Sequence, residues 1–173
     1  MQTVFIGDSH LARLRRELRG FAGDVRNAAR GGATSLDLLR QADGAGVGAS
    51  DCVVVSVGTN DAAPWKQVPV AEYVQALSTL MTSHSPQGWV FVAPPGVVEE
   101  RLTGARDRTN AVIDDYRLAA IALCEDVGGH VVGTDLLLET LGAKAFAEDG
   151  LHLNGTGYRV LVPAIQSACE ALR

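Results

Sequence analysis

Short hydrophobic runs along the chain alternate with segments of helical periodicity. Five runs have the composition of β-strands, three of them continuous and two weaker: residues 3–6, 51–57 and 89–93, and residues 24–27 and 130–132. The run at residues 51–57 is rich in valine and lacks polar alternation, which is typical of a strand buried on both faces of a parallel sheet. Residues 89–93 end at Pro94 and Pro95, which cannot continue a central strand.

Four longer segments repeat apolar residues at helical spacing: residues 10–19, 70–81, 109–127 and 158–172. Strands that alternate with helices pair in parallel through right-handed crossovers. We therefore predict an α/β fold, a three-layer α/β/α sandwich of the flavodoxin-like type with about five parallel strands. The length of 173 residues, without a repeat or a linker, indicates a single domain over residues 1–173.

The composition is that of an ordinary globular chain and excludes several partners. Hydrophobic residues make up 47% and charged residues 20%, enough to bury a full core. The net charge of −5 argues against a nucleic-acid partner. The arginines of segment 10–19 are interpreted as a solvated helix face, since acidic residues elsewhere balance them: Arg13, Arg15, Arg16 and Arg19. No apolar stretch has the length of a transmembrane segment.

The cysteines give no disulfide framework and no metal-ligand spacing, because they are three in number and far apart: Cys52, Cys124 and Cys169. We expect each to be a small buried apolar residue. Together with the absence of a signal-peptide pattern, this predicts a cytoplasmic location. Frequent alanine, glycine and arginine indicate a bacterial source with a GC-rich genome.

Candidate chemistry follows the ends of the predicted strands, where ligands bind in open parallel sheets. Ser9 comes directly after the first strand, where the chain turns into a helix. The backbone N–H of Ser9 would then point outward at the helix N-terminus, which suits a nucleophile whose attack creates an oxyanion. The alternative is a plain helix cap, since Asp and Ser are preferred there.

Two further strand ends carry groups that could bind an oxyanion. Gly31 and Gly32 follow the second strand and allow close backbone approach to a ligand. Asn60 follows the strand at residues 51–57 and would project an amide donor over the sheet. The alternative for the glycines is a tight turn into a helix that is capped by Thr34 with Asp37. The alternative for Asn60 is a structural role in a turn, where Asn is a common residue.

Near the C-terminus, Asp149 precedes His152 in a short turn. This spacing could bring the carboxylate to one imidazole nitrogen, fix the tautomer and leave the other nitrogen free as a base. The alternative is a surface turn with an idle histidine. We expect His84 and His130 to be structural or solvated, and His10 to lie on a helix surface, with a position beside the pocket as the alternative.

Taken together, these blocks resemble the GDSL/SGNH hydrolase superfamily, whose name refers to Ser, Gly, Asn and His. The matching segments are residues 7–9 (Gly-Asp-Ser), Gly32, residues 58–61 (Gly-Thr-Asn-Asp) and residues 149–152 (Asp-Gly-Leu-His). The similarity runs the length of the chain. One departure is His10, which stands where the family often has leucine.

The resemblance implies a serine esterase that forms an acyl-enzyme. Ser9 would attack the ester carbonyl, His152 would accept its proton, and Asp149 would orient His152. The Ser9 N–H, the Gly32 N–H and the Asn60 amide would form the oxyanion hole, with Gly31 as the substitute if the glycine register is shifted by one. The partner implied is a small-molecule ester, and neither a metal nor a cofactor is expected.

Other functions remain open on the same residues. An acyltransferase or a thioesterase would use the same triad, and a non-catalytic flavodoxin-like binding module would use only the fold. A phosphate-binding module lacks both the G-x-G-x-x-G and the G-x-x-x-x-G-K-[ST] fingerprints. Residues 58–69 and 94–109 are the connections long enough to shape a pocket wall, and they lack an extended apolar lid. We therefore expect a shallow site that prefers short acyl groups.

Overall fold

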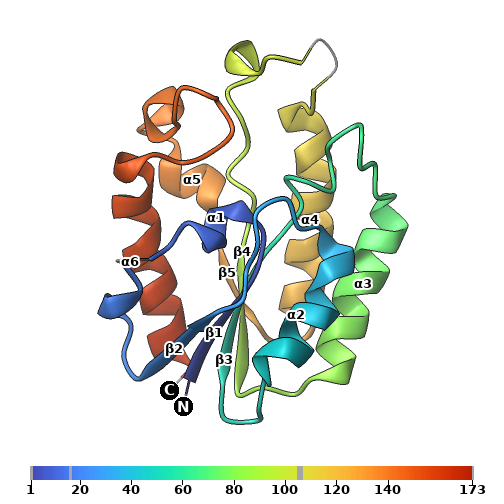
Figure 1. The fold of residues 1–173 in the computed structure, drawn as a ribbon, viewed down its shortest axis with the longest axis vertical. Coiled ribbons are helices and arrows are strands. Elements are labelled where there is room, and N and C mark those ends of the chain that lie inside the picture. The colour runs from blue at the N-terminus through green and yellow to red at the C-terminus, as the bar shows by residue number, and fades with distance from the viewer. Residues whose placement is uncertain (1, 16, 105–106, 173) are drawn as a thin grey trace.

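The computed structural model describes residues 2–15, 17–104 and 107–172 (Figure 1). Its centre is a five-stranded parallel sheet in the order β2-β1-β3-β4-β5. The strands are β1 (Gln2–Gly7), β2 (Asp24–Asn27), β3 (Cys52–Ser56), β4 (Gly88–Val92) and β5 (His130–Val132). The predicted number and direction of strands are confirmed, including the two weaker segments.

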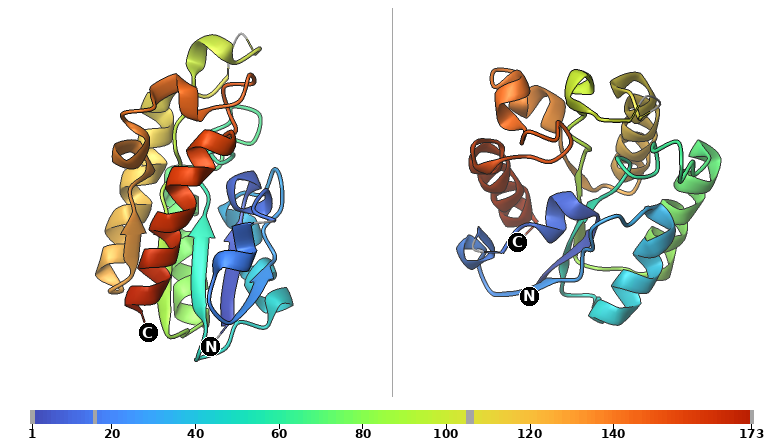
Figure 2. Two further views of the ribbon diagram at one scale, coloured as in Figure 1. Left: turned by 90° about the vertical axis from the view of Figure 1, so that its left-hand side faces the viewer. Right: turned by 45° about the horizontal axis from the view of Figure 1, so that its top comes forward.

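Helices cover both faces of the sheet (Figures 1 and 2). The α-helices are α1 (Ser9–Ala12), α2 (Leu38–Ala45), α3 (Val70–Ser83), α4 (Asn110–Asp126), α5 (Thr134–Leu138) and α6 (Gly155–Ala171). Short 3-10 helices occur at Glu17–Gly20, Ser35–Asp37, Glu99–Arg101 and Gly142–Ala145. Helices α2, α3 and α4 lie on one side and α1, α5 and α6 on the other, so the predicted three-layer sandwich is confirmed.

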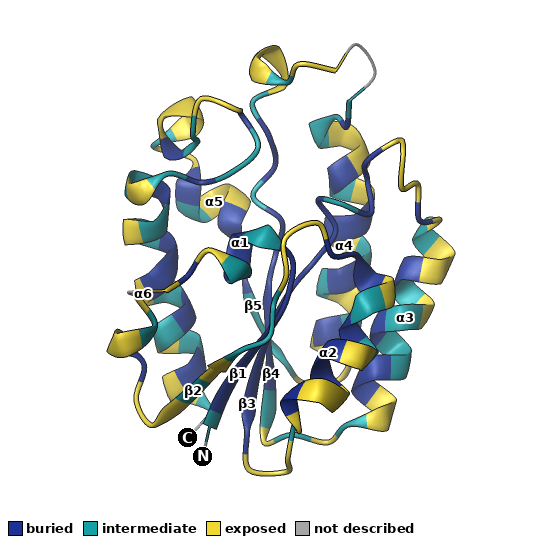
Figure 3. Cartoon of the chain, in the orientation of Figure 1, coloured by how far each residue is buried: buried dark blue, intermediate teal, exposed yellow. Residues whose placement is uncertain are grey.

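Alternate side chains of the strands enter two separate cores, as the period of two along a strand requires. Val53 and Val55 pack in the core beneath α2, α3 and α4. Val54, between them, packs in the core beneath α1 and α6. Every residue of β3 is buried, as the valine run predicts for a central parallel strand (Figure 3).

The predicted helix over residues 10–19 is wrong in length, since α1 ends at Ala12 with Arg13 as its C-cap. The side-chain amide of Asn27 in β2 donates to the carbonyls of Leu11, at 2.8 Å, and Leu14, at 3.2 Å. The Leu11 carbonyl would otherwise accept from the Arg15 N–H, which bonds the Glu17 carboxylate instead. Of the arginines assigned to that helix face, Arg16 lies outside the described residues.

The three cysteines are all buried, as expected. Within the described part of the chain, no helix combines the length and the apolar character that crossing a membrane requires.

Candidate active site

The turn after β1 places Ser9 at the sheet's carboxyl edge. Gly7 has φ of +131°, and a side chain there would lie 2.0 Å from the Ser56 carbonyl oxygen, so only glycine fits. The side chain of Gln41 accepts from the Gly7 N–H at 2.6 Å and donates to the Gly7 carbonyl at 3.0 Å. Asp8 caps α1 by accepting from the His10 N–H. Because Asp8 is the cap, the Ser9 hydroxyl is left for another partner.

The partner of Ser9 is His152, which reaches it from the turn before α6. The Nε2 atom of His152 lies 3.1 Å from Ser9 Oγ, and its Nδ1 atom lies 2.6 Å from Asp149 Oδ2. The other carboxylate oxygen of Asp149 accepts from the backbone N–H groups of Leu151 and His152, each at 2.9 Å. The structure thus brings the three predicted residues into one hydrogen-bonded chain across 143 positions of sequence.

The charge state of Asp149 suits a group that orients an imidazole. Partial burial disfavours its carboxylate, but the hydrogen bonds from the His152 ring and the two backbone N–H groups outweigh this and lower the pKa of Asp149 to about 2. Gly150, at φ of +68°, allows the tight turn between Asp149 and His152. The carbonyl of Gly150 accepts from the Val98 N–H at 2.7 Å, which anchors the turn.

Backbone and side-chain N–H groups around the Ser9 hydroxyl are available to an oxyanion. Within the described residues, the backbone N–H groups of Ser9 and Gly32 donate to no protein acceptor, and the same holds for Gly31. The Asn60 amide donates one hydrogen to the Ala33 carbonyl at 3.0 Å, which leaves its second hydrogen available. Gly31, Gly32 and Asn60 line the same cavity as Ser9 and His152.

Asp61 links the loop that carries Gly32 to the loop that carries Asn60. Its carboxylate accepts from the Ser35 N–H at 2.8 Å and from the Gly58 N–H at 3.0 Å. Burial raises the pKa of Asp61, although these hydrogen bonds oppose the shift. The loop after β2 and the loop after β3 are therefore held at a fixed separation.

Two cations that the sequence analysis did not single out complete this side of the site. Arg108 is buried, and its guanidinium donates to the Thr59 carbonyl at 2.8 Å and to Asn60 Oδ1 at 3.5 Å. The Asn60 amide is thus held at both ends. Lys66 donates to the Gly32 carbonyl. Arg108 lies 48 positions from Asn60, so no local sequence signal could have found this contact.

The cavity beside Ser9 has a volume of about 610 Å³. Among the described residues that line it, only Ala12 and Leu151 have apolar side chains; the others have polar or charged side chains or are glycines. The expectation that residues 94–109 form a pocket wall is wrong for the described part of that segment, none of which lines the cavity. This connection supports the cavity from outside: the Val98 N–H donates to the Gly150 carbonyl in the Asp149 turn, and Arg108 donates to Thr59 and Asn60.

The expected surface position of His10 is also wrong. His10 is 1% exposed, its ring centroid lies 6.2 Å from that of His152, and neither of its ring nitrogens has a hydrogen-bond partner. Burial lowers the pKa of His10 to about 3 and raises that of Asp8 to about 7. Between about pH 3 and about pH 7, both side chains are therefore mostly uncharged beneath the site.

No group of three or more metal-binding side chains occurs among the described residues. The chemistry available at the site is that of a hydroxyl, an imidazole, a carboxylate and several N–H donors. This set matches nucleophilic acyl transfer, in which a base activates a serine and fixed donors receive the developing negative charge.

Comparison with known proteins agrees with this chemistry. Residues 6–160 match the model of the GDSL-like Lipase/Acylhydrolase family. No curated protein matches the chain. The fold is shared with the lipase/acylhydrolase from Enterococcus faecalis, at a TM-score of 0.82 and 21% identity over 96% of this chain and 93% of that one. It is also shared with an acetylxylan esterase from Geobacillus stearothermophilus, at a TM-score of 0.73 and 19% identity over 97% and 93%.

A third structure with the same fold is the α/β hydrolase enzyme LAE5 from the metagenome of Lake Arreo. It matches at a TM-score of 0.72 and 22% identity, over 99% of this chain and 96% of that one. These identities establish a common fold, whereas the family match extends over most of the sequence, from β1 into α6. The chain therefore belongs to the GDSL-like Lipase/Acylhydrolase family and is a serine hydrolase that acts on ester bonds.

Proposed function

We propose that Ser9, His152 and Asp149 are the catalytic triad of an esterase that hydrolyses short-chain carboxylic esters. The observation that carries the proposal is the hydrogen-bonded chain from Asp149 to His152, at 2.6 Å, and from His152 to Ser9, at 3.1 Å. The Ser9–His152 distance is within hydrogen-bond reach of a nucleophile and its base, and the His152–Asp149 distance is within reach of a base and the group that orients it.

In this mechanism Ser9 Oγ attacks the ester carbonyl carbon while His152 Nε2 takes the hydroxyl proton. The negative charge that forms on the carbonyl oxygen is received by the Ser9 N–H, the Gly32 N–H and the Asn60 amide. His152 then gives its proton to the leaving alcohol, and the acyl group stays on Ser9. Water, deprotonated by His152, attacks the acyl-enzyme and releases the carboxylic acid.

The preference for short acyl groups follows from the lining of the cavity. Each methylene moved out of water contributes about 0.8 kcal/mol, so a long chain is favoured only where apolar side chains cover it. The described lining offers Ala12 and Leu151 for this purpose, and the other contributors are polar, charged or glycine. Acetyl to butyryl groups therefore suit the site better than fatty acyl groups.

We further propose that residues 1–173 form one domain and that the protein works in the cytoplasm. The sheet draws its strands from residues 2–132, and α6 packs back onto β4 and β5, so the early and late parts of the described chain share one sheet. The burial of all three cysteines agrees with a reducing compartment.

The test is the value of kcat/KM for 4-nitrophenyl esters from acetate to palmitate, measured with the wild type and Ser9→Ala. We expect an optimum at a short chain and, for Ser9→Ala, a loss of about 10³-fold or more. Mass spectrometry of the products with an added alcohol separates hydrolysis from acyl transfer. An optimum at a long chain contradicts the proposed specificity, and an active Ser9→Ala contradicts the triad.

A further inference from the structure

We infer that the cavity beside Ser9 contains a subsite for a negative charge, formed by Arg13 and Arg15. The natural ester would then carry an anionic group, such as a carboxylate, a sulfate or a phosphate. The inference rests on the proposed function, because it concerns the substrate of that same site.

Both arginines belong to the segment that carries the nucleophile. Arg13 is the C-cap of α1, whose first residue is Ser9, and Arg15 follows two residues later. Each lines the same cavity of about 610 Å³ as Ser9 and His152. Both residues are exposed, so their guanidinium groups are hydrated and accessible to a ligand in the cavity.

The positive charge of this pair is not neutralised within the cavity. Neither guanidinium has a hydrogen bond or an ion pair with any described residue, and no acidic residue is among the described residues that line the cavity. Asp149 is bonded to His152, and Glu17 accepts from the backbone N–H of Arg15 without lining the cavity. The protein as a whole carries a net charge of −5, whereas the permanently charged side chains among the described residues that line the cavity are the two arginines.

Most other arginines in the described structure form hydrogen bonds or ion pairs that stabilise the fold. Arg26 donates to the carbonyls of Gly44 and Ala45 at the end of α2. Arg40 forms an ion pair with Asp37. Arg117 donates to the Pro94 carbonyl. The absence of such partners at Arg13 and Arg15 therefore distinguishes them from arginines that stabilise the fold.

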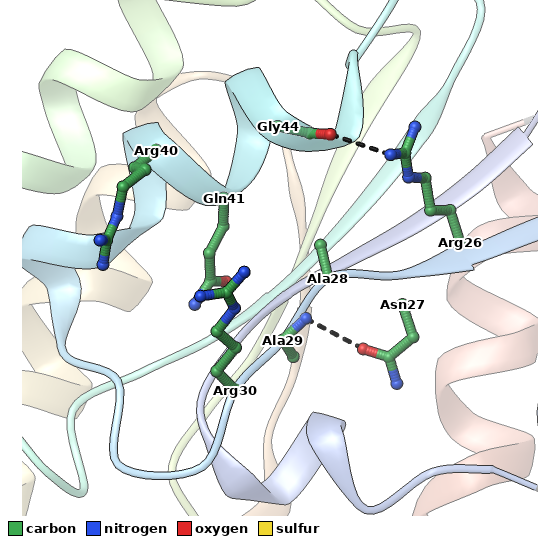
Figure 4. Close-up of a pocket in the computed structure, with 8 residues that line it drawn as sticks. All are labelled: Arg26, Asn27, Ala28, Ala29, Arg30, Arg40, Gln41 and Gly44. Carbon is green, nitrogen blue, oxygen red and sulfur yellow. Dashed lines mark hydrogen bonds between the residues drawn. The ribbon is translucent and has the colours of Figure 1, made fainter.

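A second hollow rich in arginine lies between β2 and α2 and is a weaker candidate (Figure 4). Its volume is about 320 Å³, and its lining includes Arg26, Arg30 and Arg40. Arg26 bonds to the end of α2 and Arg40 to Asp37, so among the described lining residues only the cation Arg30 has no such partner. The hollow also lacks a nucleophile. The charge beside Ser9 is therefore the one that can act on a substrate.

Two arginines without an ion-pair partner among the described residues would favour the binding of an anionic substrate in this cavity. A cleft lined by charge of one sign raises the local concentration of the oppositely charged substrate, and a guanidinium can bind a carboxylate or phosphate through two parallel hydrogen bonds. The gain applies to the anionic ester and not to its neutral analogue. Salt should reduce it, because exposed charges are screened.

The experiment compares each anionic ester with a neutral partner. One pair, 4-acetoxybenzoate and its methyl ester, places the charge on the alcohol side; the other, mono-4-nitrophenyl glutarate and 4-nitrophenyl butyrate, places it on the acyl side. The wild type is compared with the double variant Arg13→Gln/Arg15→Gln and with Arg19→Gln, a control that removes an exposed arginine further along the same segment. Ratios between proteins cancel the intrinsic reactivity of each ester.

We expect the double variant to lose about tenfold in kcat/KM on the anionic member of at least one pair, with the neutral members unchanged. The loss should shrink at high salt, and Arg19→Gln should match the wild type. Equal losses on anionic and neutral esters, or no loss on either while neutral esters are still hydrolysed, would overturn the subsite and leave the triad intact. If the wild type hydrolyses none of the esters, the proposed function itself fails, and the subsite fails with it.

Discussion

Replacing Asp149 with asparagine should nearly abolish activity without disturbing the turn that carries it. In the wild type, Oδ1 accepts from two backbone N–H groups while Oδ2 faces Nδ1 of His152. The asparagine oxygen must stay at the Oδ1 position, because an NH₂ group there would face two N–H donors. The amide NH₂ then takes the Oδ2 position and donates to Nδ1 of His152.

This donation selects the wrong tautomer of the imidazole. With Nδ1 acting as an acceptor, the proton of the neutral ring lies on Nε2, the atom 3.1 Å from Ser9 Oγ. A protonated Nε2 cannot take the Ser9 proton, so the base is lost although every atom stays in place. The corresponding change in a serine protease triad lowers kcat by about 10⁴-fold, or roughly 5.5 kcal/mol, and we expect a similar loss.

The assay is kcat for 4-nitrophenyl butyrate, with the melting temperature as a check on folding. Glu148→Gln is the matched control, since it removes the charge of an exposed neighbour in the same turn. Asp149→Ala should be no less active than Asp149→Asn, because an alanine leaves His152 free to adopt either tautomer. An Asp149→Asn variant that keeps more than about a tenth of the wild-type kcat would refute the tautomer argument.

Three further predictions concern the groups around the triad. Asn60→Ala should lower kcat by roughly 10²–10³-fold with little change in KM, and steady-state kinetics at the wild-type level would remove Asn60 from the oxyanion hole. His10→Leu should raise the free energy of unfolding in urea by about 1–3 kcal/mol, because it removes two buried nitrogens without partners; a less stable variant would contradict this. The pKa of Asp8 is raised from 3.8 to about 7, so the folded protein holds this proton more tightly than the unfolded chain does. The variant His10→Leu leaves Asp8 as the main titrating group of the pair, and its free energy of unfolding should therefore fall as pH rises from about 4 to about 7. The pKa of His10 is lowered from 6.5 to about 3, so Asp8→Asn should instead gain stability as pH rises between those values, and the same slope in both variants would contradict the assignment.

The strands were predictable because their signal is local. The valine run of β3 and the prolines after β4 mark a buried parallel strand without reference to the rest of the chain. The long helices α3, α4 and α6 were predictable for the same reason, since each spans at least three turns of apolar repeat.

The short α1 was mispredicted because distant contacts end it. The spacing of Leu11, Leu14 and Leu18 fits a helix, yet Asn27 binds two of the carbonyls that would continue it. That competition comes from a neighbouring strand and leaves no local mark in the sequence. The same segment carries His10, which is buried and whose ring lies 6.2 Å from that of His152, far along the chain.

The candidate site was predictable in its reactive groups but not in their support. Ser9, Asn60, Asp149 and His152 stand at strand ends or in a turn before a helix, where sequence order alone suggests a shared edge of the sheet. Arg108, which holds the Asn60 side chain, comes from a connection with no motif, so only the folded geometry identifies it.

The central claim is that Ser9 is the nucleophile. It is tested most directly by treating the protein with a fluorophosphonate and mapping the adduct by peptide mass spectrometry. We predict one adduct, on Ser9, that forms in parallel with the loss of esterase activity and that fails to form in Ser9→Ala. An adduct on another residue, or full inactivation of the wild type with Ser9 unmodified, would contradict the account.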